Sequence, residues 1–172
     1  MGIGKHYDGY RSFQYLTPGK DYKAFELTPE LDRVEPYRVP LSEDEERRAE
    51  TLLANTVMIS LHEHVGLFPA DISETPAMVK EGRMATAFEG LAASCWDAVL
   101  DNLLDGIGSI HSRHGWQWED VIHDLGIRLC DIAHQDSVFH CTRVDEIEKA
   151  HRDGRVAWIV SMEGAAMIEN DL

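Results

Sequence analysis

The feature that most constrains this chain is an uncharged, largely apolar run that ends in a His-x-His motif. Residues 56–61 carry no charge, and the sequence continues as His62-Glu63-His64. Such a run predicts a buried β-strand with the two histidines at its C-terminal end. Successive side chains of a strand alternate between its faces, so both imidazoles are expected on one side, with Glu63 opposite. Two neutral imidazoles on one side can bind one metal ion, although a single His-x-His in a strand also arises by chance.

A second apolar run ends in the same way near the other end of the chain. Residues 156–162 predict another strand, and Glu163-Gly164 follows it directly. A glutamate can bridge two divalent cations, with one carboxylate oxygen on each. Taken alone, Glu163 fits a helix-capping or turn residue better than a metal ligand. Together with the first run it becomes a third candidate metal ligand.

Predicted helices and strands alternate between these two runs. Ser42 and Glu45 have the spacing of a capping box, which predicts a helix to about residue 54. Further helices are expected at residues 75–80, 116–135 and 144–152, and a strand at 137–142. Residues 91–96 are expected to form another strand, although their alanines could equally carry a helix, and residues 97–104 are compatible with a helix. Such alternation favours an α/β fold with a mainly parallel sheet, whose strands all end on the same side. His62, His64 and Glu163 can then converge although they are far apart in sequence.

Composition limits the classes of partner and compartment. The chain has 172 residues, 44% of them hydrophobic, which suits a globular domain with a core. Its net charge of −15 argues against nucleic acid or an anionic membrane as a partner. The cysteines Cys95, Cys130 and Cys141 are widely spaced, so no disulfide framework or zinc knuckle is expected. We also expect no signal peptide or membrane span, and hence a cytoplasmic protein.

The first 41 residues are expected to form an irregular arm, and residues 42–172 the α/β part. Aromatic residues alternate with glycines and charged residues in the arm. The arm also contains four prolines, at positions 18, 29, 36 and 40, so long regular elements are not expected there. The aromatic side chains are expected to hold the arm on a surface, either of this chain or of a neighbouring subunit.

Residues 118–164 carry a resemblance to a known family. With Val144-Asp145-Glu146-Ile147 and the segment of residues 159–165, this block resembles the first half of the membrane (renal) dipeptidases. These are metallopeptidases of the amidohydrolase superfamily with a (β/α)8 barrel. Their first strand ends in His-x-Asp and a later strand in Glu-Gly, at a separation similar to that of His62-Glu63-His64 and Glu163-Gly164 here. The resemblance spans roughly residues 50–172.

The resemblance implies the N-terminal half of a (β/α)8 (TIM) barrel of the metal-dependent hydrolase type. It implies that His62 and His64 bind one metal and that Glu163 bridges two. The expected cofactor is two zinc ions, with manganese, iron, cobalt or nickel as alternatives. His64 stands where the dipeptidases have an aspartate, which makes the site more like the His-x-His of other amidohydrolases and leaves peptide specificity open.

The family's remaining ligands lie in a second barrel half, and a complete barrel needs about 250 residues. We therefore expect that half from another chain or from a portion absent from this sequence, and hence a homo- or hetero-oligomer. The implied reaction is hydrolysis of an amide-type C–N bond in a small molecule or dipeptide by a metal-activated water, with Glu163 as a catalytic residue. A non-catalytic or structural subunit with vestigial histidines stays open, as does a lyase or isomerase of the same fold. His111 and His114 are expected at the surface, with substrate contact as a second possibility.

Overall fold

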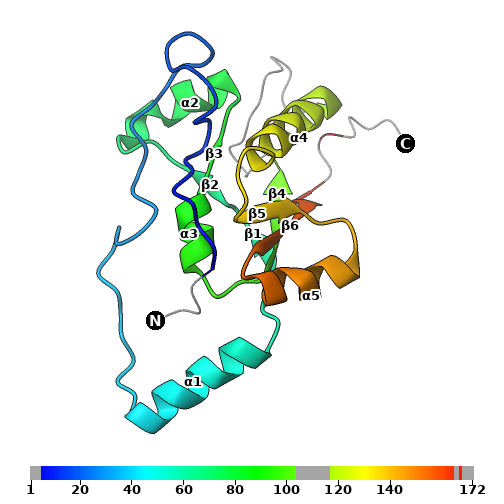
Figure 1. Ribbon diagram of the computed structural model, residues 1–172. Coiled ribbons are helices and arrows are strands. Elements are labelled where there is room, and N and C mark those ends of the chain that lie inside the picture. The colour runs from blue at the N-terminus through cyan, green and yellow to red at the C-terminus, as the bar shows by residue number, and fades with distance from the viewer. Residues whose placement is uncertain (1–4, 104–116, 165–166, 168–172) are drawn as a thin grey trace.

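The computed structural model describes residues 5–103, 117–164 and 167, so His111 and His114 lie outside the described residues. The expected α/β class is confirmed, because helices alternate with the strands of a parallel sheet (Figure 1). In chain order the elements are α1 (Glu43–Asn55), β1 (Ile59–Glu63), β2 (Gly66–Leu67), the 3-10 helix η1 (Ile72–Glu74), α2 (Thr75–Glu81), β3 (Ala85–Thr86), α3 (Phe88–Ala93), β4 (Ala98–Leu103), α4 (Trp118–Ile132), β5 (Val138–His140), α5 (Val144–Asp153) and β6 (Val156–Met162).

The main sheet has four strands in the order β1-β4-β6-β5, and every neighbouring pair is parallel. β2 and β3 form a separate antiparallel pair. β4 pairs with β6 along its whole length, from Ala98 opposite Ala157 to Leu103 opposite Met162. β1, β4 and β6 lie side by side in the order in which they occur in the chain. β5 departs from that order, since it lies outside β6 and pairs only with its first three residues.

The hydrophobic core lies between this sheet and α4. Val121 and Ile132 of α4 pack with Val99 of β4 and Trp158 of β6, and all four side chains are buried. The apolar side chains of α4 therefore pack on the sheet. The same helix also buries four charged residues: Asp120, Asp124, Arg128 and Asp131.

Two predicted elements in the middle of the chain are wrong. Residues 91–96, predicted as a strand, contain the end of helix α3, and residues 97–104, judged compatible with a helix, contain strand β4. Ala92 and Ala93 suit a helix better than a strand. The pattern of β4 was misleading because Asp101 and Asn102 interrupt its apolar residues, yet both are buried with polar partners.

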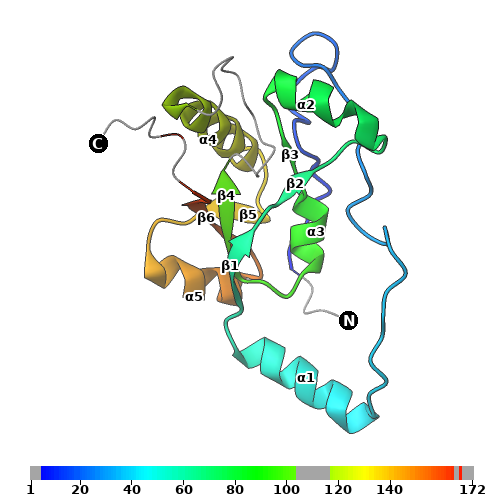
Figure 2. The ribbon, with the colours of Figure 1, turned by 180° about the vertical axis from the view of Figure 1, so that it is seen from behind.

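β1 forms as expected, but it is not a buried strand. Ile59 is 40% exposed and Leu61 74% exposed, because β1 is the edge of the sheet and its ladder joins it to β4 alone among the described strands. Helix α1 has the predicted capping box and no buried residue, and it projects from the rest of the molecule (Figure 2). Eight of the 13 large apolar side chains exposed in the described residues lie between positions 31 and 61.

The first part of the N-terminal arm packs on this chain, which is the first of the two predicted alternatives, whereas residues 31–41 are exposed. In residues 5–42 the structure has isolated bridges but no helix or strand. Tyr10 and Phe13 are buried. Asp131 of α4 accepts hydrogen bonds from the Tyr10 hydroxyl at 2.6 Å, from the Phe13 amide at 2.9 Å and from Ser12. The division into an arm and a separate domain at residue 42 stays a prediction.

The described helices include none that is both long and apolar enough to cross a membrane. All three cysteines carry free thiols, and Cys141 is the buried one.

Candidate metal centre

The three predicted ligands meet at the C-terminal ends of β1 and β6. The Nε2 atoms of His62 and His64 are 3.1 Å apart. Oε2 of Glu163 lies 3.6 Å from Nε2 of His62 and 3.5 Å from Nε2 of His64. Each residue therefore directs one ligand-type atom at a common centre, and the three atoms lie within 4.8 Å of one another, close enough to hold one metal ion.

These spacings are compatible with a small cation between the three side chains. Zinc with ligands about 2.0–2.1 Å away in a tetrahedron keeps those ligands about 3.3 Å from one another. The observed separations of 3.1, 3.5 and 3.6 Å lie around that value. A hydrogen bond between neutral imidazoles accounts for the 3.1 Å contact, but the two carboxylate contacts exceed the usual range of about 2.7–3.2 Å. The donor set of two imidazoles and one carboxylate is one that zinc accepts.

The backbone of β1 is irregular next to the two histidines. The pairing of β1 with β4 advances three residues from Ser60 to Glu63 but only two on β4, so β1 carries one extra residue there. An insertion of this kind is a β-bulge, which bends a strand and redirects its side chains. The Ser60 hydroxyl donates a 2.6 Å hydrogen bond to Glu63 across the irregularity. Sequence reasoning placed the histidines on one side from simple alternation and did not predict the bulge.

Two buried side chains of β4 hold the backbone on either side of His64. Nδ2 of Asn102 donates to the Glu63 carbonyl at 3.3 Å, and the Val65 amide donates to Oδ1 of Asp101 at 3.2 Å. Asp101 has no exposed surface and Asn102 is 2% exposed. His64 is therefore carried by a peptide segment that is fixed at both neighbours.

Asp101 also links the strands of the site to α4. Its Oδ2 accepts from Nη1 of Arg128 at 2.6 Å and from Nε1 of Trp158 at 2.7 Å. Nε of Arg128 in turn donates to Oδ1 of Asp124 at 3.2 Å. Trp158 belongs to β6, the strand that leads to Glu163. Val65, which follows His64, and Trp158 of the strand that leads to Glu163 thus both donate hydrogen bonds to the buried carboxylate of Asp101.

Sequence reasoning missed this network. Its available signal was the polar pair Asp101-Asn102 inside an apolar run, which is unusual unless such residues have buried partners. Arg128 gave no signal, because an arginine on a helix is ordinarily assigned to solvent.

A second buried carboxylate organises the opposite end of the sheet. Asp97, just before β4, accepts from Nζ of Lys5 at 2.7 Å, from the Met58 amide at 2.9 Å and is 2.9 Å from Nδ1 of His151. Burial alone raises the pKa of Asp97, but hydrogen bonds from Lys5, Met58 and His151 outweigh it and lower that pKa below its usual value. This cluster joins the arm, the start of β1 and α5, and so fixes where β1 begins.

The candidate centre itself is open. The side chains of His62, His64 and Glu163 are 57%, 39% and 61% exposed. Holding these exposed side chains in one arrangement costs conformational entropy. The free energy of metal binding would offset that cost. Metal binding at this site stays a prediction.

Comparison with known proteins identifies no relative. The chain matches no protein-family model, no curated protein and no solved structure.

Proposed function

We propose that this protein is a metal-dependent hydrolase that cleaves an amide-type C–N bond in a small molecule or dipeptide. The observation that carries the proposal is the convergence of His62, His64 and Glu163 at spacings suited to a cation. They lie at the C-terminal end of a parallel sheet, where α/β enzymes such as the barrels place their chemistry. The reaction class comes from the resemblance of residues 118–164 to the dipeptidases.

Each residue has a definite part in this proposal. Nε2 of His62, Nε2 of His64 and Oε2 of Glu163 would hold one divalent cation, and the other oxygen of Glu163 would face a second. Zinc suits these donors best, with manganese, iron, cobalt or nickel as alternatives. A cation bound there supplies a Lewis acid that polarises a carbonyl and makes water acidic enough to act near neutral pH. Asp101 and Asn102 would keep His64 oriented by holding the peptide groups next to it.

The exposure of the site and of β1 supports a further element of the proposal. An unpaired strand edge with exposed apolar side chains favours association with more β-structure. We propose that further strands of a (β/α)8 barrel cover β1, contributed by another chain or by a further portion of the protein. In that arrangement β1, β4 and β6 are barrel strands and β5 is an addition at the edge. The additional strands would bring the remaining metal ligands.

Metal analysis combined with hydrolysis assays tests the proposal. After incubation with zinc and removal of excess metal, we expect one to two equivalents per assembled site, and loss of most of that metal in His64→Ala and Glu163→Gln. His6→Ala is the matched control, because His6 is exposed and its backbone contacts Gly154, away from the candidate centre. Chelator-sensitive release of amino acids from a dipeptide panel supports the enzyme. Specific metal binding without hydrolysis supports the non-catalytic alternative, and metal binding equal in all variants contradicts the site.

A further inference from the structure

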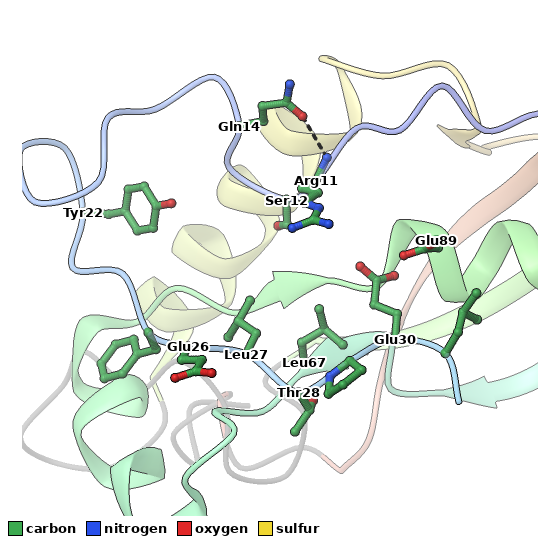
Figure 3. Close-up of a pocket in the computed structure, with 13 residues that line it drawn as sticks. Arg11, Ser12, Gln14, Tyr22, Glu26, Leu27, Thr28, Glu30, Leu67 and Glu89 are labelled. Atoms are coloured by element: carbon green, nitrogen blue, oxygen red, sulfur yellow. Dashed lines mark hydrogen bonds between the residues drawn. The ribbon is translucent and has the colours of Figure 1, made fainter. Parts of the chain in front are cut away.

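A cavity of about 670 Å³ lies between the N-terminal arm and the segment that contains β2 and α3 (Figure 3). Its walls come from Arg11, Ser12, Gln14, Tyr22 and residues 25–31 of the arm, from Leu67 of β2 and from Glu89 of α3. The volume falls within the range of about 300–1,000 Å³ that is usual for small-molecule sites. His62, His64 and Glu163 do not line this cavity, so it is separate from the candidate metal centre.

Charges of both signs line the cavity without pairing. Within the described residues, the Arg11 guanidinium and the Glu89 carboxylate have no hydrogen bond or ion pair, whereas the backbone amide and carbonyl of Arg11 are both bonded to Gln14. An arginine and a glutamate on one cavity that do not neutralise each other leave a positive and a negative binding point. A ligand with separated opposite charges is complementary to such a pair.

Glu30 strengthens the negative point. Its Oε2 accepts a 2.9 Å hydrogen bond from the Gly90 amide, which fixes the carboxylate at the start of α3. Burial raises the pKa of Glu30, and the neighbouring Glu89 adds to that rise, while backbone hydrogen bonds and Arg11 oppose it. Figure 3 shows the carboxylates of Glu30 and Glu89 side by side, with Arg11 on an adjoining wall. A ligand ammonium group between the two carboxylates would relieve their mutual repulsion.

The wall on the other side of the cavity combines apolar side chains with the carboxylate of Glu26 and the hydroxyl of Thr28. Leu27 and Leu67 lie together on the side of the cavity away from Arg11 and are partly buried (Figure 3). An aliphatic side chain of a ligand gains free energy by covering them.

We propose that this cavity binds a zwitterionic small molecule of the amino-acid or dipeptide class with an apolar side chain. The ligand ammonium contacts Glu30 and Glu89, its carboxylate contacts Arg11, and its side chain packs on Leu27 and Leu67. This proposal depends on no property of the candidate metal centre, so the two sites can be tested independently.

Calorimetric titration with three related probes tests the proposal. Chelator-treated protein is titrated with leucine, with leucinamide, which lacks the carboxylate, and with N-acetylleucine, which lacks the ammonium. We expect leucine to bind about tenfold or more tighter than either analogue, since each loses one charge-assisted contact. No leucine binding at millimolar concentration, or equal affinity for all three probes, overturns the proposal.

Variants assign each charge to its partner. Arg11→Met is expected to weaken leucine about tenfold and leave leucinamide unchanged, whereas Glu89→Gln weakens both. Glu148→Gln, an exposed residue of α5 paired with Arg152, is the matched control and is expected to bind leucine like the unmodified protein. His62→Ala distinguishes the two sites, because leucine binding persists there if the cavity is the site. Loss of leucine binding in His62→Ala, or equal affinities in Arg11→Met, Glu89→Gln and the control, refutes the assignment.

Discussion

Replacing Arg128 with methionine tests the buried charge network beneath the candidate centre. Arg128 is 2% exposed, and its guanidinium faces Asp101 at 2.6 Å and Asp124 at 3.2 Å, whose side chains are 0% and 1% exposed. Removing one partner of a buried ion pair costs about 3–5 kcal/mol, because the remaining charge is left uncompensated. Asp101 keeps its hydrogen bonds from Trp158 and Val65, so we expect a loss toward the lower end, about 3 kcal/mol. Methionine fills similar space, which keeps any cavity contribution small.

Denaturant unfolding followed by circular dichroism measures this loss of free energy. Arg152→Met is the matched control, because Arg152 is exposed and pairs with Glu148 only at 3.8 Å, so it should cost about 0–1 kcal/mol. In Arg128→Met we also expect weaker zinc affinity under conditions where the variant is folded, since Asp101 holds the peptide next to His64. A loss below about 1 kcal/mol in Arg128→Met would refute the view that this network stabilises the sheet.

Three further predictions concern the arm, the amino end of the sheet and its edge. Tyr10→Phe removes a buried hydrogen bond to the Asp131 carboxylate and should cost about 1.5–3 kcal/mol in thermal or denaturant unfolding. Because the pKa of Asp97 is lowered, its stabilisation is present above about pH 4 and is lost as the pH falls through its folded pKa. Unfolding free energies measured from pH 6 to pH 2 should therefore fall less steeply in Asp97→Asn than in the unmodified protein. Leu61→Arg, at a side chain 74% exposed on β1, should shift assembly toward smaller species in light scattering if further strands cover this edge, and an unchanged mass would count against that cover.

Sequence alone predicted the elements whose signals are local. The capping box at Ser42 depends only on neighbouring residues, and helices are present at all four ranges where they were expected: 42–54, 75–80, 116–135 and 144–152. The convergence of His62 and Glu163 was also predictable, since it requires only that parallel strands end on the same side.

Features that depend on distant residues were not predictable. β4 was not recognised, because the burial of Asp101 depends on Arg128 and Trp158, which lie far along the chain. The apolar run of β1 correctly indicated a strand, but not its exposure, because exposure depends on which strands lie beside it. An apolar run does not specify which strands will lie beside it, so the run alone cannot predict whether its strand is buried.

The most direct test of the central claim is anomalous diffraction at the zinc edge from crystals of the protein grown with zinc. We predict a peak about 2.0–2.2 Å from Nε2 of His62, Nε2 of His64 and an oxygen of Glu163, and its loss in Glu163→Gln or His64→Ala crystals. Zinc absent from this position in well-ordered crystals, or bound only at other residues, would contradict the account.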